Sequence, residues 1–193
     1  MTSAHPEALR HSGPWTESDY LALPDDDLRI ELLDGALLVN PPPSTSHQRL
    51  NSRLWHTLDA AAPVGFEVLE GIGIRVAEGR ILIPDISVVT KPGADLTVWD
   101  PADVALVIEI VCPGSVANDR AIKPVAYAAA GIPFYLRIDH RSGAPAAVLE
   151  QLVRLDYVEV LRTEPGEPLH LSAPFEVTLD LAKLAVTVRP DDR

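Results

Sequence analysis

The stretch VIEIVCPGSVANDRAIK, residues 107–123, joins an apolar run to a polar segment that ends in a lysine. Apart from Glu109, the overlapping run ALVIEIV is wholly apolar, which is typical of a central strand covered on both faces. The residues that follow predict a helix over about 115–130, because Gly131 supplies a common helix stop. With the strand-like run FYLRID behind it, the stretch predicts a strand–helix–strand unit.

A second apolar run, ILIPDISVV, also contains a single carboxylate, Asp85. An unpaired buried carboxylate costs several kcal/mol, a large part of the roughly 5–15 kcal/mol by which domains are stable. A cationic partner, a bound metal, or a strand end that opens into a cleft would each compensate this cost. If the two strands are neighbours, Asp85 and Glu109 meet at one edge of a sheet, where carboxylate oxygens suit Mg²⁺ or Mn²⁺. A structural role, capping a loop or pairing with an arginine, is the alternative for each carboxylate.

Lys123 follows Glu109 by 14 residues and is expected on the next helix, which packs back across the sheet. There its ammonium group can reach the same cleft, where it would orient a water or stabilise charge on a phosphoryl group. Asp119 precedes Lys123 by four residues, the favourable order for an ion pair on one helix face. A surface pair of this kind, worth about a few tenths of a kcal/mol, is the simpler interpretation.

The composition is that of a soluble globular protein, with 47% hydrophobic and 23% charged residues in a chain of 193. We expect a flexible N-terminal tail, residues 1–14, and a single domain over residues 15–193. The tail lacks the apolar segment of a signal peptide, and no apolar run approaches the roughly 20 residues that cross a bilayer. Because the one cysteine, Cys112, excludes an internal disulfide, a cytoplasmic protein with no membrane partner is expected.

The formal net charge of −12 argues against a protein that holds nucleic acid through a broad basic face. Net charge does not describe a local patch, however, and a metal-dependent nuclease itself needs clustered carboxylates. The charge therefore disfavours bulk DNA binding without excluding an enzyme that acts on nucleic acid.

Outside these runs, the elements are predicted from local signals. Thr16 is a plausible helix N-cap with Asp19 as its capping-box partner, and Asp34-Gly35 favours a hairpin turn within RIELLDGALLVN. The segment HQRLNSRLWHTLDAAA has leucines at helical spacing and predicts an amphipathic helix. Peripheral strands and a short terminal helix are expected in the C-terminal part.

Taken in order, RIELLDG, a helix that begins at His47, IPDISVV, VIEIVCPGS and NDRAIKPVAYAAAGIPFYLRID resemble the Uma2 family (DUF820). This family is a branch of the PD-(D/E)XK restriction-endonuclease-like superfamily. The resemblance is most specific over residues 109–135, where E-x-x-x-P, D-x-x-x-K, a following tyrosine and A-G-x-P-x-Y occur in order. It implies an α/β (α+β) fold with a restriction-endonuclease-like core: a mixed central β-sheet flanked by helices, with extra peripheral strands.

The resemblance also implies a site, with Asp85 and Glu109 as ligands of Mg²⁺ or Mn²⁺ and Lys123 as the catalytic lysine. Glu31 would be a further acidic residue, its alternative being a solvent-facing hairpin residue. The implied activity is that of a metal-dependent endonuclease that hydrolyses phosphodiester bonds in nucleic acid, with DNA the expected substrate. A non-catalytic binding or assembly module, in which the carboxylates pair with Lys123 structurally, is the alternative. The sequence does not decide whether the substrate is DNA or RNA, or whether the protein forms a homo-oligomer.

The sequence departs from the superfamily pattern at one important position. The usual lysine lies two residues after the glutamate, where this chain has Val111, so Lys123 can replace it only if the fold brings it near Glu109. His47 matches a family position, but a histidine at a helix start commonly caps or packs and is not assigned to the catalytic set. Cys112 has no convincing histidine partner and is interpreted as a small buried residue.

Overall fold

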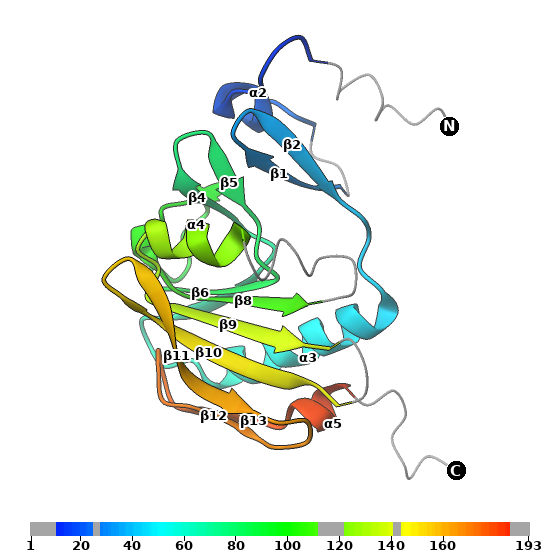
Figure 1. The fold of residues 1–193 in the computed structure, drawn as a ribbon, viewed down its shortest axis with the longest axis vertical. Coiled ribbons are helices and arrows are strands. Elements are labelled where there is room, and N and C mark those ends of the chain that lie inside the picture. The colour runs from blue at the N-terminus through cyan, green and yellow to red at the C-terminus, as the bar shows by residue number, and fades with distance from the viewer. Residues whose placement is uncertain (1–10, 25–27, 112–121, 141–143, 186–193) are drawn as a thin grey trace.

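The computed structural model places two β-sheets against each other, with helices around them (Figure 1). It describes residues 11–24, 28–111, 122–140 and 144–185. The predicted fold class is confirmed, because a mixed central sheet is flanked by helices and extended by peripheral strands. Among the helices of the described residues, none combines the length and the apolar character needed to cross a membrane.

The central sheet has six strands and is mixed: β8 and β9 pair in parallel, whereas all other neighbouring strands of this sheet pair antiparallel. In spatial order its strands are β11 (Asp156–Thr163), β10 (Ala146–Val153), β9 (Phe134–Asp139), β8 (Val104–Val111), β6 (Ile86–Val89) and β3 (Glu67–Glu70). The predicted strand–helix–strand unit is β8, α4 and β9.

A second sheet of five strands packs over one face of the central sheet, a feature that the sequence did not predict. In spatial order its strands are β2 (Ala36–Asn40), β1 (Arg29–Leu33), β5 (Arg80–Leu82), β4 (Gly73–Ala77) and β7 (Val98–Trp99). The predicted hairpin β1–β2 is confirmed, and its turn residues Asp34 and Gly35 both have positive φ. Pairing of β1 with β5 is non-local, so short-range periodicity carries no signal for it.

Three of the described helical segments begin directly after a residue whose side chain caps them, whereas the helix that begins at Lys123 has no side-chain cap. The described helical segments are α2 (Glu17–Leu21), α3 (Thr45–Ala61), the 3₁₀ turn η1 (Pro101–Asp103), α4 (Lys123–Ala129) and α5 (Leu181–Ala185). The capping box predicted at Thr16 is present, and α3 begins at Thr45, two residues before His47, because Ser44 is its N-cap. The predicted helix before residue 122, and with it Asp119 and Cys112, lies outside the described residues.

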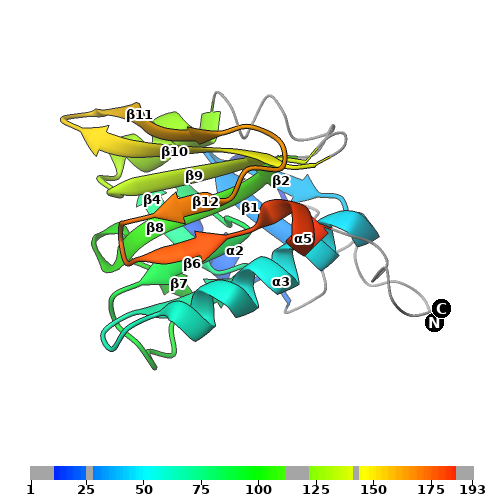
Figure 2. The same ribbon diagram turned by 90° about the horizontal axis from the view of Figure 1, so that it is seen from below.

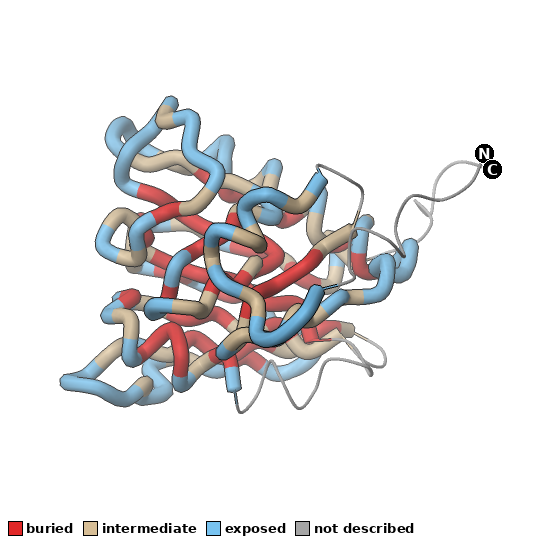
Figure 3. The backbone as a smooth tube through the Cα atoms, turned by 90° about the horizontal axis from the view of Figure 1, so that it is seen from above, coloured by how far each residue is buried: buried red, intermediate tan, exposed pale blue. Residues whose placement is uncertain are grey.

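Both faces of the central sheet are buried. Successive side chains of β8 point alternately to one face and to the other. On one face, Leu106, Ile108 and Ile110 belong to an apolar cluster with residues of α3, α5 and the hairpin of β12 (Leu169–Leu171) with β13 (Val177–Leu179). Figure 2 shows these helices and this hairpin lying over the sheet from below. On the other face, Val107 packs under α4 and the five-stranded sheet. Figure 3 shows the buried backbone along these central strands. The alternation directs Glu109 to the second face.

Candidate functional site

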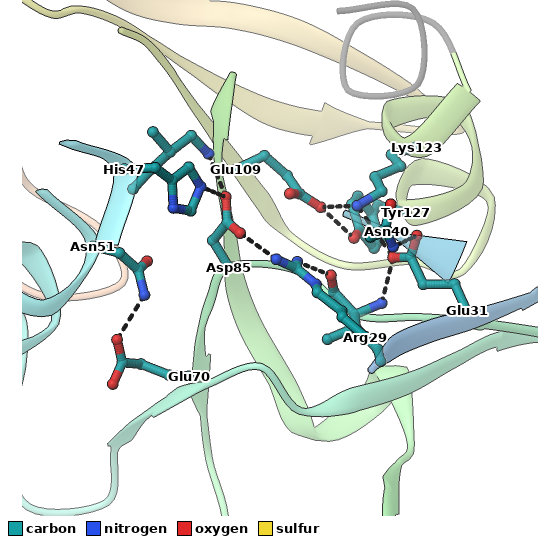
Figure 4. A network of polar contacts seen from close by, with 12 residues as sticks. Arg29, Glu31, Asn40, His47, Asn51, Glu70, Asp85, Glu109, Lys123 and Tyr127 are labelled. Carbon is teal, nitrogen blue, oxygen red and sulfur yellow. Dashed lines mark hydrogen bonds and ion pairs between the residues drawn. The ribbon is translucent and has the colours of Figure 1, made fainter. Parts of the chain in front are cut away.

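Glu109 lies on the face of β8 that α4 covers, and α4 supplies two partners to it. Lys123 Nζ lies 2.9 Å from Glu109 Oε1, and the Tyr127 hydroxyl donates to the same oxygen at 2.9 Å. Lys123 and Tyr127 are four residues apart and so share one helix face. The fold therefore brings Lys123 to Glu109 (Figure 4). This contact is what Lys123 needs if it is to replace the usual lysine, whose position is occupied by Val111.

Glu31 approaches the same ammonium group from the five-stranded sheet. Its Oε1 lies 3.1 Å from Lys123 Nζ and accepts a hydrogen bond from the Ile83 backbone N–H at 2.7 Å. Its Oε2 accepts from Asn40 Nδ2 at 3.0 Å, across the β1–β2 hairpin. The solvent-facing alternative for Glu31 is wrong, since the residue is fully buried. One lysine thus joins Glu31 and Glu109, which come from different sheets.

Asp85 lies directly before β6, and described donors reach both of its oxygens. Oδ1 accepts from an Arg29 guanidinium nitrogen at 2.6 Å. Oδ2 accepts from the Ile110 backbone N–H at 2.7 Å and lies 3.2 Å from His47 Nε2. The other terminal nitrogen of Arg29 donates to the Ile83 carbonyl. The arginine partner named as a structural alternative for Asp85 is therefore present.

The pairing of β6 with β8 brings the two strand carboxylates together. Ile86 is opposite Ile108 in this antiparallel pair, so Asp85, one residue earlier, comes opposite Glu109. The structure thus gathers all four predicted site residues at one end of the sheet, in two contact groups. Lys123 connects Glu31 with Glu109, and Asp85 lies beside them with partners of its own.

The surroundings of Asp85 and Tyr127 set their protonation. Burial raises the pKa of Asp85, but the hydrogen bond from His47 and the positive charge of Arg29 outweigh it, so the pKa lies well below its usual range. Burial and the charges of Glu109 and Glu31 raise the pKa of Tyr127 well above its usual value. Asp85 is therefore a carboxylate and Tyr127 a protonated hydrogen-bond donor at neutral pH.

Sequence reasoning left out three residues that contact the predicted set. Arg29 is two residues before Glu31, and the period of a strand places both on one face. Tyr127 belongs to the family-like motif, and its spacing of four residues from Lys123 was the available signal. His47 matched a family position but was interpreted as a capping or packing residue; the cap of α3 is Ser44, and the contact of the imidazole with Asp85 bridges 38 residues.

The described residues contain no group of three or more His, Cys, Asp or Glu side chains placed to hold a metal ion. Asp85 and Glu109 nevertheless supply carboxylate oxygens from adjacent strands. Mg²⁺ is commonly held by one or two carboxylates, with water and substrate phosphate completing its shell. The chemistry of this donor pair fits Mg²⁺ or Mn²⁺, and the metal role of the two residues stays a prediction.

A cavity of about 340 Å³ opens beside Asp85, between the first turns of α3 and the end of β3. Figure 4 shows the Asn51–Glu70 pair below His47 on this side of the cluster. The cavity is lined by Arg29, Pro43, His47, Gln48, Asn51, Ser52, Glu70, Gly71 and Asp85.

Comparison with solved structures first identifies the fold. A crystal structure described as "a putative nuclease belonging to DUF820 from Anabaena variabilis" superposes with a TM-score of 0.70 at 15% sequence identity. The match covers 90% of this chain and 100% of the other, and at this identity it shows a shared fold. The family follows from the sequence: residues 17–186 match the Uma2 family model, described as "Putative restriction endonuclease", so the chain belongs to the Uma2 family. No curated protein matches the chain.

Proposed function

We propose that the protein is a Mg²⁺-dependent nuclease that hydrolyses phosphodiester bonds in nucleic acid, most simply as an endonuclease on DNA. The observation that carries this proposal is the position of Lys123, whose Nζ lies within hydrogen-bonding distance of Glu109 and Glu31 beside the strand carboxylate Asp85. The description of the Uma2 family as "Putative restriction endonuclease" and that of the Anabaena variabilis structure as "a putative nuclease" support the same activity.

Each side chain would have a distinct task in this reaction. Asp85 and Glu109 would hold the metal, which when bound polarises the phosphate and lowers the pKa of a water. Lys123 supplies a fixed positive charge for the phosphoryl oxygens as negative charge develops on them. Glu31 keeps the ammonium group at that position, and Arg29 keeps Asp85 ionised.

Cleavage assays on the purified protein test the proposal. Wild type should cut DNA in Mg²⁺ or Mn²⁺ and lose activity in EDTA, whereas Asp85→Asn, Glu109→Gln and Lys123→Met should each lower the rate roughly a hundredfold or more. Lys91→Met is the matched control, because Lys91 is exposed and pairs with Asp103. Absence of calorimetric Mg²⁺ and Mn²⁺ binding at millimolar concentration, together with absence of cleavage of DNA and RNA, would reject the nuclease.

The alternative is a non-catalytic binding or assembly module, and the ion pairs Lys123–Glu109 and Arg29–Asp85 favour it because each gives a buried carboxylate a cationic side-chain partner. Thermal melting with and without Mg²⁺ separates the two functions. A nuclease site should give a rise in Tm with Mg²⁺ in wild type and none in Glu109→Gln. If the pair is purely structural, Mg²⁺ should not change the Tm of either protein, and Glu109→Gln should have a clearly lower Tm than wild type even without Mg²⁺.

A further inference from the structure

Arg137 lies beside Glu109 on the neighbouring strand of the central sheet. The two residues are register partners in the parallel pair β8–β9, so the strand spacing separates their backbones by about 4.8 Å. Val107 and Tyr135 precede them by two residues, and both belong to the apolar cluster on the α4 face of the sheet. Because side chains two residues apart on a strand share a face, Glu109 and Arg137 both point to that face, where Lys123 contacts Glu109.

The register continues this row of charged residues to Asp85. Asp85 comes opposite Glu109 from the β6 side, so Arg137, Glu109 and Asp85 follow one another across β9, β8 and β6. These three strands lie side by side in Figure 1. A nucleic-acid strand whose phosphate is held at Asp85 and Glu109 meets Arg137 where it continues over β9.

The two cations inside the cluster are bound by groups of the protein. Lys123 Nζ lies 2.9 Å and 3.1 Å from oxygens of two carboxylates. Both terminal nitrogens of Arg29 donate to acceptors of the fold, one to Asp85 and the other to the Ile83 carbonyl. These contacts offset buried carboxylates. A chain with a net charge of −12 therefore needs a further cation near the site if it is to bind the charged backbone of a nucleic acid.

The guanidinium group of Arg137 is held more weakly. Among the described residues its ion partner is Glu150 on β10, with 3.7 Å between Nη1 and Oε2, which is too long for a hydrogen bond. That oxygen has no hydrogen-bond partner in the described part of the chain. Burial raises the pKa of Glu150 in spite of the positive charge of Arg137. Arg137 thus has N–H donors to offer a ligand, and 18% of its side chain is exposed.

Exposed cations elsewhere in the chain are paired more closely. In five surface ion pairs of the described residues, the nitrogen–oxygen distance is 2.5–2.9 Å. The cations of these pairs are Arg75, Arg80, Lys91, Arg162 and Lys183. A carboxylate at hydrogen-bonding distance already offsets each of these charges, so Arg137 is the better donor to a phosphate.

Resting on the proposed function, we propose that Arg137 binds a phosphate of the nucleic-acid backbone next to the metal site, through two parallel hydrogen bonds from its guanidinium group. Glu150 holds the guanidinium group in the absence of substrate and competes with the phosphate for it. A phosphate contact positions the strand without reading its bases, so it serves every sequence alike. Because it forms before the chemical step and persists through it, the contact lowers KM and leaves kcat nearly unchanged.

DNA binding in EDTA tests Arg137 without depending on cleavage. Fluorescence anisotropy of labelled oligonucleotides should give a Kd about tenfold weaker for Arg137→Met than for wild type. The slope of log K against log salt should fall by about one, because one phosphate contact is lost. Arg162→Met is the matched control, since Arg162 is exposed on β11 and pairs with Glu159, and it should change neither quantity.

Glu150→Gln gives a second test, in which the expected change has the opposite sign. Removal of the competing carboxylate should tighten DNA binding several-fold, and the double variant with Arg137→Met should lose this gain. Glu176→Gln makes the same change of charge at an exposed position directly before β13 and should have a smaller effect on Kd. A purely structural pair between Arg137 and Glu150 predicts lower melting temperatures in both single variants and no gain in DNA affinity.

The outcomes separate the phosphate contact from the nuclease. Unchanged Kd and salt slope in Arg137→Met, or wild type that binds neither DNA nor RNA, overturn the contact. If Arg137→Met does not fold, absence of tighter binding in Glu150→Gln overturns it. Metal-dependent cleavage with a KM that Arg137→Met does not raise keeps the nuclease and rejects the contact. Binding that depends on Arg137, in a protein that cuts no nucleic acid, supports the contact and rejects the nuclease.

Discussion

At the scale of the residue, Lys123 is the side chain on which the cluster depends. Its ammonium group is buried between two buried carboxylates, Glu31 and Glu109. Val111, which occupies the usual lysine position of the superfamily, is itself buried at the end of β8. Lys123, at the start of α4, therefore supplies the positive charge beside Glu109, because β8 carries the apolar Val111 at the position of the usual lysine.

Replacement of Lys123 by methionine should destabilise the fold. The change leaves Glu31 and Glu109 buried without their shared cation, and breaking a buried ion pair on one side costs about 3–5 kcal/mol. Urea unfolding of wild type and variant at neutral pH measures this loss.

The comparison variant is Lys183→Met, which removes an exposed lysine paired with Asp180. Surface pairs of this kind contribute little, so no measurable change in the urea midpoint is expected. A loss of stability in Lys123→Met no larger than that in Lys183→Met would contradict a buried ion pair in the cluster.

At the scale of the element, the β1–β2 hairpin carries two residues into the site. Arg29 and Glu31 alternate with Ile30 along β1, so both point to the same face and reach Asp85 and Lys123. The turn of this hairpin rests on the N-terminal segment: the Trp15 N–H donates to the Gly35 carbonyl at 2.8 Å. The geometry of the turn thus positions part of the cluster.

Gly35→Ala should lower the melting temperature more than Gly79→Ala. Both glycines have positive φ, 81° and 70°, so the backbone strain of alanine is similar in the two variants. A Cβ at Gly35 would lie 2.8 Å from the Pro14 Cβ, whereas one at Gly79 meets nothing within 4 Å. Calorimetric melting of both proteins isolates the steric contribution, and equal shifts in Tm would show that the Pro14 contact is absent.

At the scale of the whole molecule, the cluster connects the two sheets. Arg29 and Glu31 come from the five-stranded sheet, whereas Asp85 and Glu109 belong to the end of the central sheet. The contact between the sheets is therefore partly ionic at this end, while an apolar cluster that includes Trp99 fills the rest of the interface. Because these ion pairs need ionised carboxylates, we expect the contact between the two sheets to weaken in acid.

Acid should weaken the fold through Asp85. Burial raises its pKa, but His47 and Arg29 lower it by more, so the folded value lies below the unfolded value of about 3.9. Ionised Asp85 thus stabilises the fold above about pH 4, and this stabilisation disappears as the pH falls through the folded pKa. The Tm difference between wild type and Asp85→Asn should be largest near pH 6–7 and shrink toward about pH 3.

The control for this pH series is Asp156→Asn, since Asp156 is exposed at the turn between β10 and β11. Its Tm difference from wild type should stay near zero at every pH. A constant deficit of Asp85→Asn from pH 7 to pH 3 would mean that Asp85 does not stabilise the folded state through its charge.

Much of the fold was predictable because its signals are local. The capping box at Thr16, the turn at Asp34-Gly35, the leucine spacing of α3 and the apolar run of β8 each depend on residues close together in the chain. The second sheet was not predictable, because β1 pairs with β5 about fifty residues away and short strands carry little register information. The contacts of His47 and Arg29 with Asp85 were not predicted for the same reason, since both contacts are non-local.

The sequence by itself determined the chemistry of this Uma2 protein: two carboxylates within apolar strands, an additional glutamate in the hairpin, and a lysine 14 residues after Glu109. Burial makes a charge in such a run costly, so the pattern alone demanded a partner. Only the tertiary structure decided which partner. It brought Lys123 to both Glu31 and Glu109 and paired Asp85 with Arg29, because these contacts depend on how the two sheets pack.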